Sequence, residues 1–421
     1  MKEINASIIT IGDELLIGQT IDTNSAYISQ QLNSIGIWVK KRIAVGDNRE
    51  DILSSFEEEG RHSKIIIITG GLGPTADDIT KPCLCEFFGS KLIMHDQTKE
   101  HIIRIFKTSG RVISERNIKQ AEVPDNCRVL KNERGTAPGM WFEKDGVIYI
   151  SLPGVPFEMK EIMEDEVMPS LRSVPGLPVV IHKTILTAGI GESTVADIIH
   201  EYENKLPSAI KLAYLPEYGQ VRLRLTARGE DLNKTSSLLE TNFSALKKVL
   251  EKWLVVDDDI PLQEVMVKLL ASHQKTMATA ESCTGGMIAK LITSVSGASQ
   301  VYKGSVVAYD NAVKTGMLDV DPAAIEKNGA VSEETVKAML EGIIKSTGAD
   351  YGLATSGIMG PEGGSPEKPV GTIWIAAGNK TRILTSKQFF RHNRERNIEL
   401  SSIFALNFLR RIVLADIQNA D

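Results

Sequence analysis

The chain has 421 residues, of which 42% are apolar and 24% are charged, and both fractions are ordinary for a folded protein. Its length predicts two to four domains, and its net charge of −6 gives no sign of a nucleic-acid partner. There is no apolar run long enough to cross a membrane and no signal-peptide pattern, so we expect a cytoplasmic protein without a membrane partner. The four cysteines lack the spacing of a zinc site, and we expect free thiols.

The first 172 residues alternate between buried strands and amphipathic helices. Strands are predicted over 6–12, 38–45 and 64–69, with helices over 26–32 and 49–60 between them. This alternation is typical of an α/β domain with a doubly wound sheet, in which ligands bind at the carboxyl ends of the strands. A hairpin and a rigid proline bend are predicted to follow, over 140–150 and 152–159.

Acidic side chains collect at the predicted strand ends. They are Asp13, Glu14, Asp22, Asp47, Asp77 and Asp78. Carboxylates from several strands that meet at one edge can hold a metal ion that bridges phosphate groups. The alternative is that these residues only complement helix starts.

A glycine-rich loop follows the strand over 64–69 directly. Gly70, Gly71 and Gly73 lie in it, and Thr75 comes shortly after. The spacing is wrong for a dinucleotide fingerprint, but the backbone of such a loop can approach a phosphate closely. We predict these four residues as substrate contacts, with a simple tight turn as the alternative.

Several motifs of this segment resemble known proteins. The run TGGLGPTADDIT, with GDELL and DTNS upstream, looks like the MogA/MoeA molybdopterin-binding fold. Together with GTAPGM and LPGVPFEM, it is similar to the N-terminal domain of the competence/damage-inducible protein A (CinA) family. The resemblance implies an ADP-ribose pyrophosphatase that needs a divalent metal of the Mg, Mn or Co type. It places Asp78 at a functional position and at the metal, and Asp13, Glu14 and Asp77 more loosely at the same metal.

Residues 173–256 are predicted to form a small α+β connector domain. The stretch 173–178 is typical of a linker. Strands are expected over 180–186, 210–215 and 220–227, and helices over 193–203 and 233–254. No group of catalytic side chains is visible in this segment.

A third domain is predicted over 257–421, and its most informative stretch is AESCTGG, at 280–286. A strand over 275–279 precedes it and a helix is predicted to begin at Met287. Ser282 therefore lies at a strand-to-helix turn, where Gly285 and Gly286 permit a tight bend. The free N–H groups of a helix start suit a nucleophile that generates an oxyanion. The alternative is that Ser282 or Thr284 only caps the helix.

Other segments of this domain point to the same sheet edge. A strand over 303–309 turns into a helix that carries Lys314, and a strand from Tyr351 runs into the loop from Gly357 to Gly360. Three arginines, at 391, 394 and 396, precede a closing helix over 398–412. Positive charge opposes the dipole of a helix start, so we expect an anionic partner, with a solvated charge run as the alternative.

A serine–lysine pair is the nucleophile and base that these residues favour. No Ser/His/Asp set is visible, because His273 lies on an upstream helix and His392 lies beside arginines. Lys314 is the predicted base, Lys303 the second choice, and Tyr309 a hydrogen-bonding or proton-relay partner. The N–H groups of Cys283 and Thr284 are the predicted oxyanion donors. The Cys283 thiol is the alternative nucleophile.

The C-terminal motifs resemble the nicotinamide-nucleotide amidase domain of the same CinA family. AESCTGG, YDNAVK, GAVSEETV, TSGIMGP, EKPVGTIW and RHNRERN match it in order. The resemblance implies metal-free deamidation of nicotinamide mononucleotide, in which Gly285, Gly357, Gly360 and Arg394 contact substrate. Pyridine nucleotides and ADP-ribose are then the expected partners, and a homodimer the expected assembly. The competing hypothesis is a pterin- or nucleotide-binding scaffold without catalytic activity.

Overall fold

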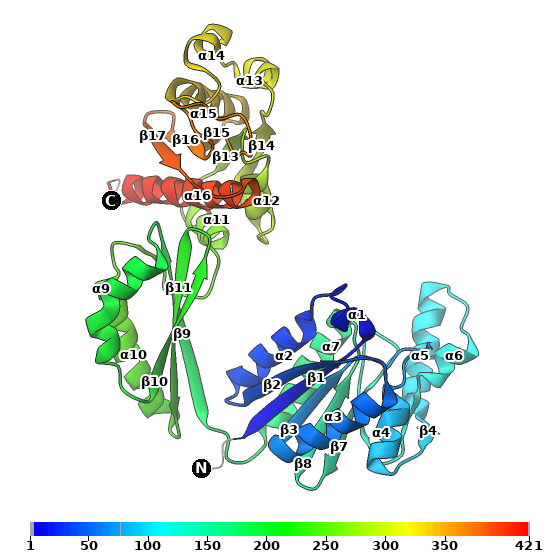
Figure 1. Ribbon diagram of the computed structural model, residues 1–421. Helices are drawn as coiled ribbons and strands as arrows, with labels where there is room; N and C mark the ends of the chain where they lie inside the picture. Colours follow the sequence, from blue (N-terminus) through cyan, green and yellow to red (C-terminus); the bar gives the residue numbers. More distant parts are fainter. Residues whose placement is uncertain (1–3, 76, 420–421) are drawn as a thin grey trace. The chain divides into compact units, whose positions relative to one another are not determined.

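The computed structural model describes residues 4–75 and 77–419, and it divides the chain into two compact units (Figure 1). The first unit comprises Met1–Ile181 with Arg228–Thr235, and the second comprises His182–Ala227 with Ser236–Asp421. Ala76, within the predicted phosphate loop, lies outside the described residues.

The N-terminal segment folds into alternating strands and helices. Its elements are β1 (Asn5–Ile11), α1 (Asp13–Leu16), α2 (Thr23–Ser34), β2 (Trp38–Val45), α3 (Arg49–His62), β3 (Ile65–Thr69), α4 (Thr80–Phe88), β4 (Leu92–Met94), α5 (Asp96–Ser109), α6 (Glu115–Lys119), β5 (Glu122–Pro124), β6 (Arg128–Leu130), β7 (Gly139–Lys144), β8 (Val147–Leu152), α7 (Pro156–Ile162), the π-helix η1 (Met163–Val167) and α8 (Met168–Arg172).

One sheet carries the predicted site of this segment, in the strand order β2-β1-β3-β8-β7-β6. The first four strands are parallel, whereas β7 is antiparallel to both of its neighbours. On one face, α2 and α7 bury Ile28 and Met159 against Ile8. On the other face, α3 and α4 bury Phe56 and Leu84. The predicted doubly wound α/β fold is therefore confirmed, with the glycine loop at the carboxyl end of β3.

The next segment is α+β, as predicted. Its elements are β9 (Val179–Ala188), α9 (Glu192–Asn204), β10 (Ile210–Glu217), β11 (Gln220–Gly229), α10 (Leu232–Val249) and β12 (Leu254–Val256). The four strands form a sheet in the order β10-β11-β9-β12. Val221, Leu223, Leu225 and Ala227 alternate along β11 as its buried residues, which matches the alternation in the sequence.

The C-terminal segment is a second α/β sheet. Its elements are α11 (Leu262–Ser272), β13 (Met277–Glu281), α12 (Met287–Thr293), the 3₁₀-helix η2 (Ala298–Gln300), β14 (Tyr302–Val307), α13 (Asn311–Leu318), α14 (Pro322–Asn328), α15 (Glu333–Thr347), β15 (Tyr351–Gly357), β16 (Thr372–Asn379), β17 (Ile383–Phe389) and α16 (Arg394–Gln418).

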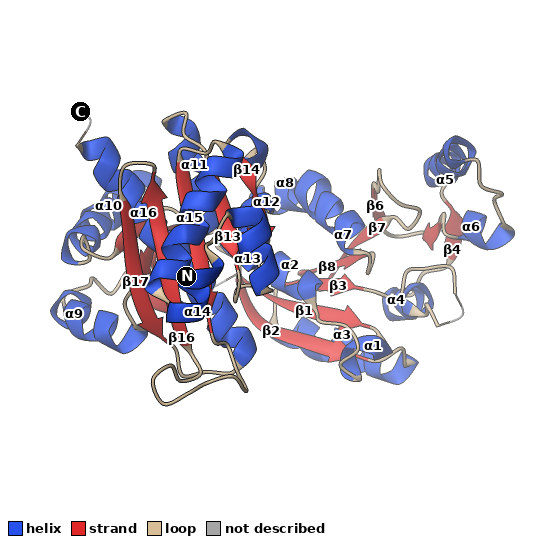
Figure 2. Ribbon diagram, turned by 90° about the horizontal axis from the view of Figure 1, so that it is seen from above, coloured by secondary structure: helices blue, strands red, loops and turns tan. Residues whose placement is uncertain are grey.

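Helices cover both faces of this sheet, whose strand order is β14-β13-β15-β16-β17. β14, β13 and β15 are parallel, and the last two strands are antiparallel. α15 packs on one face, while α11, α12 and α16 pack on the other (Figures 1 and 2). The carboxyl ends of β14, β13 and β15 meet at one edge, which brings the three predicted motifs of this domain together.

Some predicted boundaries were wrong. The helix expected over 233–254 ends at Val249, because Leu254 already belongs to β12 and pairs with Thr187. The strand expected over 275–279 is shifted to Met277–Glu281. The closing helix begins at Arg394, because the side chain of Asn393 caps it by accepting from the Arg396 N–H at 2.9 Å.

Gly342 of α15 packs directly against α13, the helix that carries Lys314. A Cβ at Gly342 would lie 2.0 Å from the Leu318 carbonyl oxygen, so we expect Gly342→Ala to cost about 1–3 kcal/mol of stability. Gly316 of α13 has no heavy atom within 4 Å of such a Cβ. Gly316→Ala should instead gain about 0.5–1 kcal/mol, because alanine is the better helix former. Thermal melting of both variants tests the packing, and equal shifts would contradict it.

Candidate active site

The turn between β13 and α12 holds Ser282. The Ser282 N–H donates to the Thr355 carbonyl at 3.0 Å, which ties the turn to β15. Gly285 and Gly286 follow with φ of 61° and 92°, a region that favours glycine. The Ser282 side chain is buried, and its hydroxyl forms no hydrogen bond to another described residue. It is therefore available for an external partner.

Lys314 is the buried basic group of this edge, with only 1% of its surface exposed. Its Nζ donates to the carbonyl oxygens of Ala308 at 2.9 Å and Tyr309 at 3.2 Å. Burial lowers the pKa of Lys314, although Asp310 and Cys283 act in the opposite direction. The Ala308 N–H donates to the Glu281 carbonyl at 2.8 Å, so the carbonyl that Lys314 binds belongs to a residue paired with the one that precedes Ser282.

A neutral Lys314 has the hydrogen-bonding pattern of a base. The neutral amine has two N–H groups, and each can donate to one of the two carbonyls. Its lone pair is then left to accept a proton. Lys303, the second-choice base, is exposed on β14. The structure therefore favours Lys314 over Lys303.

Cys283 points into the hydrophobic core instead of toward solvent. It is 5% exposed and packs with the residues of α11, α12 and α16. Burial raises the pKa of its thiol to about 12, and hydrogen bonding to Thr355 offsets this only in part. The thiolate is the nucleophilic form, so the structure disfavours Cys283 as the nucleophile.

Arg394 joins two other predicted site residues. Its guanidinium donates to the Tyr309 hydroxyl and to the Gly360 carbonyl, both at 2.8 Å. Tyr309 is 62% exposed, and its phenol bonds to Arg394, whereas its backbone carbonyl bonds to Lys314. The tyrosine thus links the arginine to the lysine through two different groups.

The loop after β15 is fixed by a buried amide. Asn397 donates to the carbonyls of Met359 at 3.1 Å and His392 at 2.9 Å, and is fully buried. Gly357 ends β15, and Gly360 has a φ of 88°. The loop and the start of α16 are therefore held together beside Tyr309.

In the N-terminal domain, the glycine loop approaches the sheet too closely for any side chain. A Cβ at Gly70 would lie 2.1 Å from the Ile11 carbonyl, and one at Gly71 would lie 2.2 Å from the Thr80 hydroxyl. The next residues of the loop bind Asp78: its carboxylate accepts from the N–H groups of Gly73 at 2.8 Å and Thr75 at 2.9 Å, and from the Thr75 hydroxyl. Asp78 therefore organises the loop.

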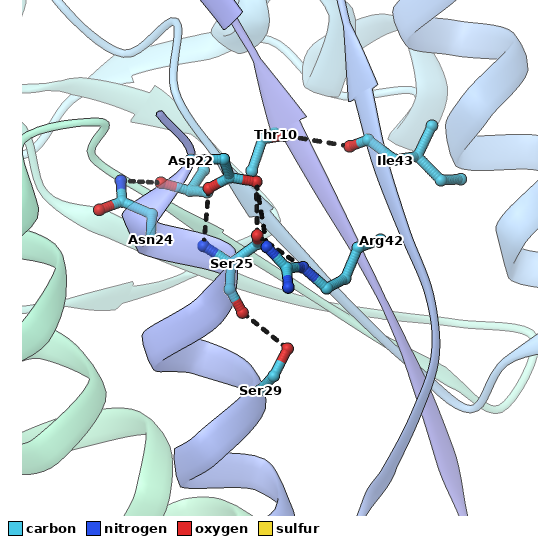
Figure 3. A network of polar contacts seen from close by, with 8 residues as sticks. Thr10, Asp22, Asn24, Ser25, Ser29, Arg42 and Ile43 are labelled. Atoms are coloured by element: carbon cyan, nitrogen blue, oxygen red, sulfur yellow. Dashed lines mark hydrogen bonds and ion pairs between the residues drawn. The ribbon is translucent and has the colours of Figure 1, made fainter. Parts of the chain in front are cut away.

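Three other acidic residues of the strand ends also have local structural roles. The carboxylates of Asp13 and Asp47 each accept from the other residue's backbone N–H at 3.1 Å. Asp22 caps α2 by accepting from the Ser25 N–H at 2.8 Å, and it lies beside Arg42 (Figure 3). Asp22 therefore caps a helix, which is the alternative to metal binding that the sequence left open.

The remaining negative charge at this edge is concentrated near Asp47. Partial burial raises the pKa of Asp47, and the nearby charges of Asp13, Glu14 and Asp77 add to this rise. Oxygen donors in such a cluster suit a hard divalent cation. Among residues 4–75 and 77–419, however, no three histidine, cysteine or acidic side chains form a metal-ligand group. The residues fit a cation in chemistry and charge, without preformed ligand geometry.

Glu281, which immediately precedes Ser282, was not predicted as a site residue. Its side chain is fully buried and accepts hydrogen bonds from the Thr284 hydroxyl and from the N–H groups of Ile288 and Ala289. The signal in the sequence was an acidic residue at the end of an otherwise apolar strand. An acidic residue next to a glycine-rich turn is equally consistent with an exposed position, so this signal did not identify Glu281.

Comparison with known proteins assigns all three segments. Residues 7–173 match the probable molybdopterin binding domain, 182–255 the damage-inducible protein CinA KH domain, and 259–413 the CinA C-terminal domain. A CinA-like protein of Cytophaga hutchinsonii is 47% identical over 408 residues, covering 97% of this chain and 98% of its own. One of Flavobacterium psychrophilum is 42% identical over 413 residues, covering 98% and 99%.

The chain belongs to the CinA family. The family resemblance stated from the motifs is therefore confirmed. The crystal structure of competence/damage inducible protein CihA from Agrobacterium tumefaciens is also similar, with 32% identity and a TM-score of 0.35 over 36% of this chain and 93% of that one. No helix among the described residues of this CinA family member combines the length and apolarity needed to cross a membrane.

Proposed function

We propose that the C-terminal domain hydrolyses the carboxamide of nicotinamide mononucleotide to nicotinic acid mononucleotide and ammonia. The observation that carries the proposal is the buried Lys314, whose amine donates to the carbonyls of Ala308 and Tyr309 where Ala308 bonds to Glu281, the residue before Ser282. The exposed Arg394, beside the Gly360 loop, supplies the positive charge for the substrate phosphate.

The reaction follows from these groups in two stages. Ser282 Oγ forms a bond to the carboxamide carbon while its proton moves to Lys314 Nζ. The backbone N–H groups of Cys283 and Thr284 stabilise the oxyanion, the C–N bond breaks, and the lysine proton passes to the departing ammonia. Water then hydrolyses the acyl-serine ester. Tyr309 is placed by Arg394 at the same edge, where it orients the substrate.

A second activity is proposed for the N-terminal domain, namely metal-dependent cleavage of ADP-ribose to AMP and ribose 5-phosphate. The negative charges of Asp13, Glu14 and Asp77, which add to the effect of burial in raising the pKa of Asp47, favour it. Asp13, Glu14 and Asp77 are the residues that would hold a divalent ion, which when bound neutralises charge on the pyrophosphate. The glycine loop supplies backbone contacts for the phosphates. A nucleotide-binding scaffold without activity is the competing outcome for both domains.

Ser282→Ala should reduce deamidation by orders of magnitude, because it removes the only group assigned to attack the amide carbon. The fold should survive, since the loss amounts at most to a helix cap, about 0.5–2 kcal/mol. Cys283→Ala is the matched variant and should retain turnover. Ammonia release by both purified proteins, with melting curves to confirm folding, decides the nucleophile. An active Ser282→Ala beside an inactive Cys283→Ala would assign the chemistry to the thiol.

The rate should rise with pH as Lys314 loses its proton, because the neutral amine is the base. Since burial lowers the pKa of Lys314, the rise should be centred below the ordinary lysine value of about 10.4. A profile of kcat/KM against pH measures this. Lys314→Met should abolish turnover, whereas Lys303→Met, at an exposed position, should keep the wild-type profile. An unchanged profile in Lys314→Met would exclude Lys314 as the base.

In the N-terminal domain, Asp78→Asn should abolish ADP-ribose cleavage by loosening the loop that Asp78 binds, while deamidation continues. Asp77→Asn leaves those loop bonds intact and should instead raise the metal concentration needed for half-maximal rate. Both rates are measured in the full chain with and without a chelator. Deamidation that stops with the chelator would overturn its metal-free assignment, and unchanged pyrophosphatase turnover in Asp78→Asn would remove Asp78 from the site.

A further inference from the structure

The fully buried carboxylate of Glu281 lies directly beneath the turn that carries Ser282. Its Oε2 accepts from the Thr284 hydroxyl at 2.8 Å and from the Ile288 N–H at 3.0 Å, and its Oε1 accepts from the Ala289 N–H at 2.8 Å. The hydroxyl of Thr279 lies 3.3 Å from Oε1. These donors match an ionised carboxylate, which only accepts hydrogen bonds.

These bonds close the turn from both ends. Ile288 and Ala289 lie in the first turn of α12, where backbone N–H groups have no partner within the helix. Glu281, the last residue of β13, supplies that partner across the intervening residues 282–287. The strand end and the helix start are thereby held by one side chain. A buried charge is costly unless it is fully bonded, so the turn and the carboxylate stabilise each other.

The carboxylate also fixes the direction of the neighbouring hydrogen bonds. Thr284 has one hydroxyl proton and donates it to Glu281, so at its 2.9 Å contact with the Thr355 hydroxyl it must accept. Thr355 has then donated its own proton to Thr284. The backbone N–H groups of Cys283 and Thr284 bond to no other described residue.

We infer that Glu281 is the positioning residue of the amidase site, whose carboxylate holds the Ser282 hydroxyl and the two oxyanion-binding N–H groups in place for attack. The inference rests on the proposed deamidation. Glutamine cannot replace Glu281. Each carboxylate oxygen accepts a hydrogen bond from one N–H group, and the NH2 of a glutamine amide would place a donor against one of them. Glu281 does not touch substrate; it acts through the turn.

Glu281→Gln in the full chain tests the inference, with Glu59→Gln as a matched control. Glu59 is also a fully buried carboxylate, bonded to the Ser7 hydroxyl and to Lys41 Nζ at 2.8 Å, but it lies in the N-terminal domain. Both variants should lose stability. Only Glu281→Gln should lose turnover, by about 10²-fold in kcat, the effect of a misplacement near 1 Å. KM should stay close to the wild-type value, since the groups that contact substrate remain.

Two measurements are independent of activity. Amide hydrogen exchange over residues 282–289 should accelerate in Glu281→Gln and stay unchanged in Glu59→Gln. Alkylation of Cys283, followed by peptide mass spectrometry, should become faster in Glu281→Gln alone, because a loosened turn exposes a thiol that is only 5% exposed in the wild-type protein. If Glu281→Gln does not fold, the isosteric Thr284→Val removes one of the same bonds and should shift kcat, exchange and alkylation in the same direction.

The outcomes separate the two proposals. A wild-type protein that releases no ammonia overturns the deamidation, and exchange and alkylation then decide whether Glu281 orders the turn. A wild-type enzyme that deamidates, with Glu281→Gln equal to Glu59→Gln in kcat per folded molecule, overturns the role of Glu281. Unchanged exchange and alkylation in Glu281→Gln also overturn it.

Discussion

Lys314 is carried into the interior of the C-terminal domain by α13, and the surrounding structure must accommodate an amine where a charge is costly. The backbone carbonyls of Ala308 and Tyr309 accept hydrogen bonds from this amine where β14 turns into α13. Backbone carbonyls carry only partial negative charge. They accept hydrogen bonds from the amine without stabilising its protonated form as strongly as a carboxylate would. Burial therefore lowers the pKa of Lys314, in the direction of the neutral amine that the proposed mechanism needs as its base.

Two potential nucleophiles near Lys314, the hydroxyl of Ser282 and the thiol of Cys283, lie in different surroundings. Cys283 and Ser282 are adjacent, yet the thiol is directed into the core and its pKa is raised to about 12. The serine hydroxyl has no hydrogen-bond partner in the described part of the chain and lies at the turn. Thiols are usually the more reactive group, so the difference is made by the burial of the thiol.

The sequence predicts the sheet edges well, because strands buried on both faces give unbroken apolar runs and glycines follow them. Ser282, Lys314 and the Gly360 loop were placed at one edge on this basis, and the structure puts them there. Side-chain partners were not predictable. Asp22 and Asp78 turn to local N–H groups, and Glu281 turns inward to reach Ile288 and Ala289, because those choices depend on atoms brought close only by folding. The end of α10 was missed for a related reason, since apolar residues continue at helical spacing into β12.

The two sheet edges use acidic residues in opposite ways. In the C-terminal domain one carboxylate is fully enclosed and its donors fix a turn, so its charge is matched before any ligand arrives. In the N-terminal domain Asp13, Glu14 and Asp77 are exposed, and their negative charges repel that of Asp47, whose pKa is already raised by partial burial. Such repulsion is relieved when a cation binds, and it is then that the exposed carboxylates gain a common partner. A neutral carboxamide needs positioned dipoles, whereas a pyrophosphate brings negative charge of its own. The enclosed Glu281 therefore suits the proposed deamidation, whereas the open acidic edge of the N-terminal domain suits a ligand that enters together with a cation.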